Sequence, residues 1–334
     1  YTRTKVNFGN RNVLKSILSF ARIDLIYLFK SIAVPAVSIL LLFFVGMEMY
    51  AEIEKGIRLP QKYAGSGLMA TTISENFHLL GLLILTYFIN DLYWRSSLSG
   101  FSLVEKATCF SKSKLVGHLL SVTVLLFFFT AVLIAEGLVF QAVYDYFFID
   151  WKAYAGVILF NTLPLVLFSA FLLMVNDSLR NRFLALGISL LAAFTSTGPV
   201  SKKVLSYPLF RIFSDYKGSY SDFNGYGVYA AAFAERLVFG LSLIFAFWML
   251  HRWLKRRKWN FKEEAALAIL LLAGIYCGKL FMKGYVPEDA ETKVAGAIAY
   301  EKEFRKYKNL PSPVITMGEP RKKWNPGPTV NRFG

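Results

Sequence analysis

The chain has few of the residues, and none of the short motifs, on which metal, thiol and nucleotide chemistry usually depend. Its 334 residues include only three histidines and two cysteines. It contains no HExxH zinc helix, CxxC pair, GxSxG nucleophile turn or GxxxxGK[ST] phosphate loop. The lack of the last motif excludes ATP binding through a P-loop. We therefore expect no catalytic residues, no metal site and no cofactor within this chain.

Acidic residues are also scarce beside basic ones, with 22 Asp and Glu against 38 Lys and Arg. A basic chain can bind nucleic acid, but here the Lys and Arg residues cluster at the ends of apolar runs and between them. We therefore expect no nucleic-acid partner. Cys109 lies between two runs and Cys277 lies within the last one, on different sides of any reasonable topology, so no disulfide is expected.

Long apolar runs dominate what remains. Hydrophobic residues make up 55% of the chain, and 31 residues are Phe. A helix of about 20 apolar residues crosses a hydrocarbon core roughly 30 Å thick. The sequence therefore predicts an all-α membrane protein, a polytopic bundle of about seven transmembrane helices. The runs cover residues 32–50, 76–94, 115–140, 153–175, 183–198, 230–250 and 265–282.

The basic residues indicate how the bundle is oriented. With the N-terminus placed in the cytoplasm, the inner segments carry 18 Lys and Arg residues and the outer loops carry 8. Cytoplasmic loops of membrane proteins are enriched in Lys and Arg. We therefore expect a cytoplasmic N-terminus, an extracytoplasmic C-terminus and a lipid bilayer as the surrounding medium.

Three regions follow along the chain. Residues 1–31 are predicted to be a cytoplasmic arm ending in an amphipathic interface helix, because apolar residues recur at helical spacing over 12–30 while charges interrupt them. Residues 32–282 form the transmembrane domain. Residues 283–334, charged and then proline-rich, are predicted to be an extracytoplasmic stalk or the start of a truncated outer domain. The chain begins at Tyr1 rather than Met, and we expect it to be part of a longer polypeptide.

Charged residues near the membrane provide the first candidate sites. Asp91 and Arg95 have the i, i+4 spacing of an ion pair at the inner end of the second crossing. Glu136 is the most interior acid. The sequence leaves open whether it faces a cavity, a neighbouring helix or the headgroups.

Three stretches resemble a known family. The first is Asn90–Arg95, followed by Glu105–Lys106 and Lys114 in a polar hairpin; the second is the YSDxNG pattern within residues 219–227; the third is residues 300–313. Together with the order of apolar runs, they resemble the type-2 exporter permeases of the ATP-binding-cassette (ABC) class. The resemblance is to the second membrane half of bacterial permeases that continue into an extracytoplasmic gluzincin aminopeptidase domain. The zinc helix of that domain is absent here.

The resemblance implies a permease subunit of an ABC-type exporter in the bacterial inner membrane. A separate cytoplasmic ATPase would bind ATP and Mg, and a second permease half, identical or different, would pair with this one. An extracytoplasmic partner is a further expectation. The residues involved fall into three groups, which are the ATPase-coupling residues Phe101, Leu103, Val104, Glu105 and Lys106, their brace Asp91 and Arg95, and the outer-loop motif Tyr220, Ser221, Asp222, Asn224 and Gly225.

Two other functions stay open at this point. The chain is also consistent with a membrane anchor or scaffold for an outer domain or partner, which suits the aromatic loop 199–229 and the stalk 283–334. An intramembrane enzyme is the second alternative. It would need His78, His118 and Glu136 to converge at one depth.

Overall fold

The computed structural model describes residues 10–54, 63–102, 113–205, 207–214, 220, 225–226, 229–256 and 261–284. The chain divides into two units, residues 1–284 and 285–334, and every described residue belongs to the first. The elements in chain order are α1 (Asn10–Lys30), α2 (Ala33–Ile53), α3 (Ser66–Leu98), α5 (Lys114–Val143), α6 (Trp151–Val157), the π-helical turn η2 (Ile158–Thr162), α7 (Leu163–Ser178), α8 (Arg182–Ser196), α9 (Gly198–Val204), the 3₁₀ turn η3 (Pro208–Phe210), α10 (Tyr229–Arg256) and α11 (Phe261–Gly284).

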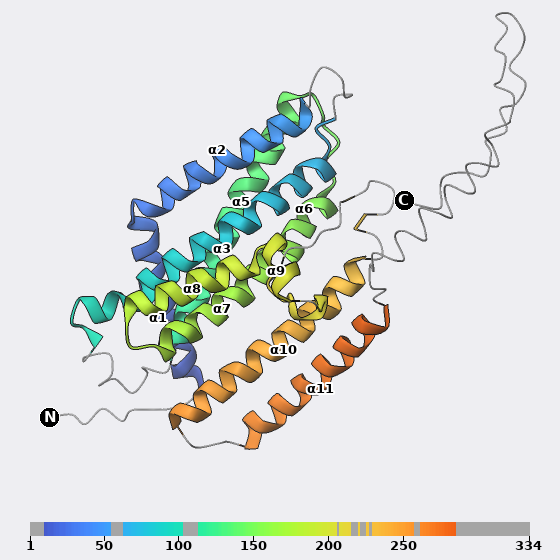
Figure 1. Cartoon of the computed structure of the whole chain (residues 1–334). Coiled ribbons are helices and arrows are strands. Elements are labelled where there is room, and N and C mark those ends of the chain that lie inside the picture. The colour runs from blue at the N-terminus through green and yellow to red at the C-terminus, as the bar shows by residue number, and fades with distance from the viewer. Residues whose placement is uncertain are drawn as a thin grey trace, which may run out of the picture. The chain divides into compact units, whose positions relative to one another are not determined.

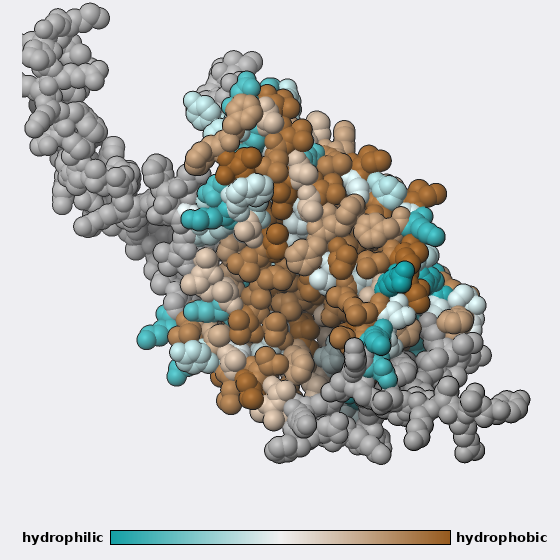
Figure 2. Space-filling view, turned by 180° about the vertical axis from the view of Figure 1, so that it is seen from behind, coloured by the Kyte–Doolittle hydropathy of each residue, from teal (hydrophilic) through white to brown (hydrophobic). Residues whose placement is uncertain are grey.

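The predicted all-α membrane bundle is confirmed. Among the described residues, six helical stretches are long and apolar enough to cross a bilayer. They lie in α2, α3, α5, the continuous α6–η2–α7 rod, α10 and α11. The surface is apolar as well as the interior, since Phe43, Leu191 and Leu272 are each more than half exposed. Figure 2 shows hydrophobic residues over most of one face of the bundle. Such a continuous apolar surface is stable in lipid and not in water.

The helix formed by the fifth predicted crossing is shorter than the others. The run predicted over 183–198 forms α8, whose 15 residues rise about 22 Å, which is less than the hydrocarbon thickness. The helix stops at Thr197, whose backbone is extended, and α9 begins at the next residue. Pro199 explains the break, because it has no N–H to donate to the preceding turn.

The first helix lies across the bundle. In Figure 1, α1 crosses the long helices at a steep angle near one of their ends, which we call the α1 end; the opposite end is called the distal end. Ala21 and Leu28 of α1 are buried, whereas Leu14 and Leu18 are exposed. One apolar side of α1 is therefore left uncovered by the bundle, and its place in the membrane interface stays a prediction.

A glycine allows α1 to approach α5. A Cβ atom at Gly117 would lie 2.6 Å from the Cβ of Phe20 and 3.3 Å from the carbonyl oxygen of Ile17. The backbones of the two helices therefore meet at Gly117 with no room for a side chain.

The core lies between α2, α3, α5 and α7. Its largest fully buried side chains include Phe77, Phe88, Phe129 and Phe168. Within the α6–η2–α7 rod, Pro164 cannot donate to the preceding turn, and the π turn η2 immediately before it absorbs the irregularity.

Candidate functional site

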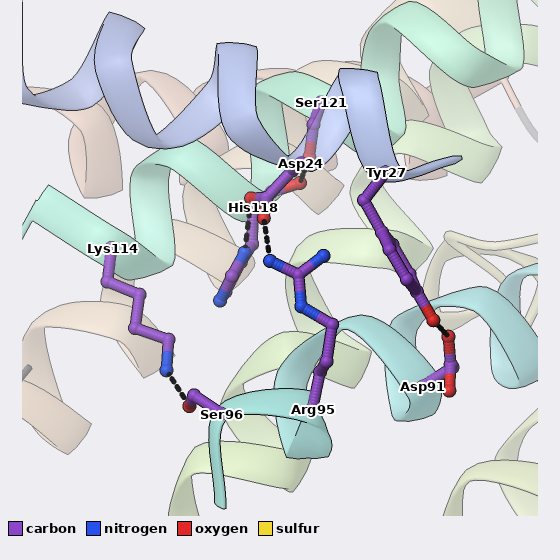
Figure 3. Close-up of polar contacts among 8 residues, drawn as sticks. All are labelled: Asp24, Tyr27, Asp91, Arg95, Ser96, Lys114, His118 and Ser121. Carbon is purple, nitrogen blue, oxygen red and sulfur yellow. Dashed lines mark hydrogen bonds and ion pairs between the residues drawn. The ribbon is translucent and has the colours of Figure 1, made fainter. Parts of the chain in front are cut away.

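A buried carboxylate at the α1 end connects three helices (Figure 3). Asp24 of α1 is 2% exposed, and its Oδ2 lies 2.6 Å from Nδ1 of His118 on α5. Its Oδ1 lies 3.8 Å from Nη2 of Arg95 on α3. An acid this well buried is tolerated only when it is paired. The Asp24 contacts therefore hold α1 to both α3 and α5.

Tyr27, one turn further along α1, makes a second connection to α3. Its hydroxyl donates to Oδ2 of Asp91 at 2.8 Å, and the guanidinium of Arg95 lies 4.2 Å from the centre of its ring. Burial and this hydrogen bond to Asp91 raise the pKa of Tyr27 above its ordinary value.

The Asp91–Arg95 ion pair predicted from their spacing is therefore wrong. Arg95 pairs with Asp24, and Asp91 accepts from Tyr27. Both partners come from α1, and helical spacing within α3 carries no information about that helix. The role of Asp91 and Arg95 as a brace stays a prediction.

The ends of α3 and α5 are also joined directly. Nζ of Lys114, the first residue of α5, donates to Oγ of Ser96 near the end of α3 at 2.6 Å. The predicted coupling residues belong to the chain segment between these two helices. Phe101 is 54% exposed. Leu103, Val104, Glu105 and Lys106 lie outside the described residues.

A second acid links the ends of α3, α7 and α10. Asp177 of α7 accepts a hydrogen bond from the hydroxyl of Tyr93 on α3 at 2.8 Å. Its other oxygen lies 2.6 Å from Nε2 of His251 on α10. The pair is not evident from the sequence, because 74 residues separate its members and a histidine beside a run end is not distinctive by itself.

Buried amides complete the network. The side chain of Asn176 accepts from Nε1 of Trp94 at 2.9 Å, and Nε of Arg182 donates to Oδ1 of Asn90 at 3.1 Å. Asn90 and Asn176 are themselves hydrogen-bonded at 3.3 Å. The α1 end is thus joined by polar contacts among α1, α3, α5, α7, α8 and α10, which favours movement of these helix ends as one unit.

The distal end has a separate polar cluster around Ser66. Its hydroxyl accepts from the Gln141 amide at 3.0 Å and from the backbone N–H of Asp150 at 2.9 Å. Tyr154 in turn donates to Gln141 at 2.7 Å. These contacts tie the start of α3 to the end of α5 and the start of α6.

Two residues of the predicted outer-loop motif are described. The hydroxyl of Tyr220 donates to Asp150, and its ring occupies the space beside Gly67, where a Cβ would lie 2.8 Å from ring carbon Cδ1. Gly225 has φ +58°, which favours glycine. Ser221, Asp222 and Asn224 lie outside the described residues.

Replacing Tyr220 with Phe should raise the pKa of Asp150. The Tyr220 hydroxyl, followed by the backbone N–H of Lys152, holds this pKa below its ordinary value. A lowered pKa means that the carboxylate stabilises the fold at neutral pH and that this contribution disappears as pH falls through the lowered pKa. In Y220F the Asp150 carboxyl should therefore titrate at a higher pH, and its contribution to the stability at neutral pH should be smaller. The carboxyl ¹³C shift of Asp150 measures the change, and Tyr63→Phe is a control, since Tyr63 is 85% exposed. An unchanged titration in Y220F would refute the assignment.

Glu136 faces a neighbouring helix. The carboxyl lies against Gly46 of α2, where a Cβ would be 2.5 Å from Oε1, and Oε2 is buried without a hydrogen-bond partner among the described residues. Of the three possibilities that the sequence left open, the structure selects the neighbouring helix.

The three residues required by the intramembrane-enzyme alternative do not converge. His118 and Glu136 lie on α5 at positions 18 residues apart, about 27 Å along the helix. His118 pairs with Asp24, whereas His78 lies 3.2 Å from Asn161 on η2. Within the part of the chain that the structure describes, no group of three His, Cys, Asp or Glu side chains is placed to hold a metal ion.

Comparison of the chain with protein-family models, with curated proteins and with solved structures finds no match.

Proposed function

We propose that the chain is the transmembrane permease subunit of an ABC-type exporter in the bacterial cytoplasmic membrane. A separate cytoplasmic ATPase supplies the energy, and a second membrane half completes the transporter. The observation that carries the proposal is the attachment of α1 to α3 and α5 through Asp24. These two helices flank the hairpin on which the ATPase is proposed to dock.

The orientation follows from charge. The α1 end carries Arg22, Lys30, Arg95, Lys114 and Arg252, and this excess of basic residues favours a cytoplasmic location. Helix α1, which begins at Asn10, then lies on the cytoplasmic side. The distal end, where α11 ends at Gly284, is then extracytoplasmic.

In the proposed mechanism, closure of the ATPase pair pushes on the hairpin and on α1 together. The buried Asp24 contacts and the Lys114–Ser96 hydrogen bond resist separation of these elements. The push is therefore transmitted to α3 and α5, which tilt as rigid bodies. No side chain of this chain performs covalent chemistry in this scheme.

The double variant Val104→Asp/Glu105→Arg should lose the ATPase. Val104→Asp replaces an apolar side chain with a charged one, and Glu105→Arg reverses the sign of a charge. Capture of the ATPase should therefore fall by about tenfold or more. The measurement is photolabelling of the purified complex with radioactive 8-azido-ATP. A labelled partner should accompany the wild-type chain, and also the control Lys203→Glu, whose side chain is exposed on α9.

Two results would overturn the proposal. One is undiminished labelling with the double variant, which would remove the docking assignment. The other is a wild-type complex that contains no azido-ATP-labelled protein but does contain extracytoplasmic partners, which would favour the scaffold alternative.

A further inference from the structure

Glu75 is an exposed acid within a membrane-spanning helix. The apolar run predicted here begins at residue 76, which placed Glu75 in the preceding loop. In the structure, α3 already begins at Ser66, so Glu75 lies on the third turn of the helix. Its side chain is exposed and has no hydrogen bond or ion pair with any residue that the structure describes.

Contacts between helices place Glu75 near the middle of the bundle. At the distal end, Glu54 follows α2 and accepts from Tyr144. Gly46 of α2 and Met69 of α3 both contact the 136–137 turn of α5, so they lie at about the same depth. Glu54 lies eight residues beyond Gly46 toward the distal end, and Glu75 lies six residues beyond Met69 in the opposite direction. The two rises place Glu54 and Glu75 about 20 Å apart along the bundle. In the other direction, the rise from Glu75 to Asp91 is about 24 Å.

Polar groups continue inward from Glu75 at the same level. The side-chain amide of Asn161 on the π turn η2 donates to the carbonyl of Ser74 at 3.3 Å and lies 3.2 Å from Nδ1 of His78. The hydroxyls of Thr130 and Thr162 are 2.8 Å apart. A π turn beside buried polar side chains is a common feature of functional sites in helices.

An apolar stripe continues from Glu75 along the same face of α3. Leu79, Leu83 and Tyr87 follow at intervals of four residues and are 49%, 49% and 54% exposed. The face therefore combines one carboxyl group at mid-depth with an apolar, aromatic surface toward the α1 end.

Lipid is an unfavourable neighbour for this face. A carboxylate at the centre of a bilayer costs about 2.5–3.5 kcal/mol even on insertion scales.

A second copy of the chain would not neutralise the Glu75 carboxylate either. Among the described residues, the basic side chains nearest to mid-depth on α10 and α11 are Arg236 and Lys279. Arg236 is engaged within its own chain, where Nη2 donates to the carbonyl oxygen of Ser214 at 3.1 Å and the guanidinium lies 5.0 Å from the centre of the Phe233 ring, and Lys279 lies within about two turns of the distal end of α11.

We propose that Glu75 binds the cationic group of an amphipathic substrate, whose apolar part lies against Leu79, Leu83 and Tyr87. The carboxylate supplies the charge, and the apolar stripe supplies the surface for the rest of the molecule. This inference rests on the proposed function, because a permease must hold its cargo at mid-depth, and it names the class of cargo.

Binding of radioactive tetraphenylphosphonium to the full chain in neutral-lipid nanodiscs tests the proposal. Wild type should bind it saturably. In Glu75→Gln the dissociation constant should rise by about tenfold or more, which corresponds to about 1.4 kcal/mol. Glu75→Asp should retain binding. The matched control is Glu48→Gln, an exposed acid near the distal end of α2; its binding should stay at the wild-type level.

A second measurement does not depend on the probe. In a background with both native cysteines changed to Ser, a cysteine at position 75 should react with a membrane-impermeant maleimide. A cysteine in place of Leu191, which is 64% exposed on α8, should not.

Wild-type affinity in Glu75→Gln, absence of saturable binding to wild type, or an unreactive cysteine at 75 would each overturn the proposal. None of these results would alter ATPase capture, so they are distinguishable from failure of the proposed function.

Discussion

Gly117→Leu should lower the free energy of unfolding by about 2–3 kcal/mol and push α1 away from α5. A Cβ at this position already meets the Cβ of Phe20 at 2.6 Å, and the carbonyl of Ile17 at 3.3 Å is backbone that cannot rotate away. Overpacking of this kind typically costs about 1–3 kcal/mol, and the extra carbons of Leu add to that cost. The better helix propensity of Leu recovers less than about 1 kcal/mol.

The matched control is Gly187→Leu on α8, where an added Cβ would meet nothing within 4 Å. It should leave the stability unchanged or slightly raised. Thermal unfolding in detergent measures the stability of both variants. Spin labels replacing Leu18 on α1 and Leu120 on α5, both exposed, report the separation of the helices. If Gly117→Leu kept wild-type stability and label distance, the close contact between α1 and α5 would be refuted.

The same variant bears on the proposed function. If α1 and the hairpin transmit one push, a displaced α1 should reduce transport-coupled ATP hydrolysis even where the ATPase is still captured. Gly187→Leu should not have this effect.

Asp24→Ala should be the most destabilising of the single charge deletions at the α1 end. Removing one member of a buried ion pair costs about 3–5 kcal/mol, and we expect about 2–4 kcal/mol here because Arg95 is a third exposed and partly solvated. Asp24→Asn should lose less, since an amide oxygen can still accept from His118. Glu48→Ala, the deletion of an exposed acid, should stay within about 0.5 kcal/mol of wild type.

A double-mutant cycle separates pairing from simple loss of packing. Asp24→Ala and His118→Ala should show a coupling energy above about 1 kcal/mol, because their side chains are 2.6 Å apart and both buried. Unfolding in mixed micelles measures all four proteins. Additive effects of the two substitutions would show that the pair does not hold α1 in place.

Hydropathy predicted the fold because membrane spans obey a local rule. In lipid every backbone N–H and C=O must be satisfied within the segment, so an apolar run of sufficient length becomes a helix whatever its neighbours are. The run at 115–140 accordingly lies within α5, and the run at 32–50 lies within α2 except for its first residue. The start of α3 was misplaced because Thr71, Thr72 and Glu75 lower the hydropathy of its first turns, although those turns are helical and largely packed inside the bundle.

The polar pairs were not predictable in the same way. Asp24 and His118 are 94 residues apart, and Asp177 and His251 are 74 apart. The one pair inferred from spacing, Asp91–Arg95, was wrong because α1 supplied nearer partners for both side chains. Glu75 shows the same limit, since its exposure depends on which faces of α3 the neighbouring helices cover.

From its sequence alone this protein is a bundle of apolar helices that crosses a membrane several times, because hydrophobicity belongs to each residue and adds up along the chain. Only the tertiary structure decided that α1 is anchored through Asp24, that Glu136 lies against Gly46 and that Glu75 is exposed at mid-depth. Those outcomes depend on how each helix is rotated and how closely its neighbours approach. The packing of distant side chains sets both.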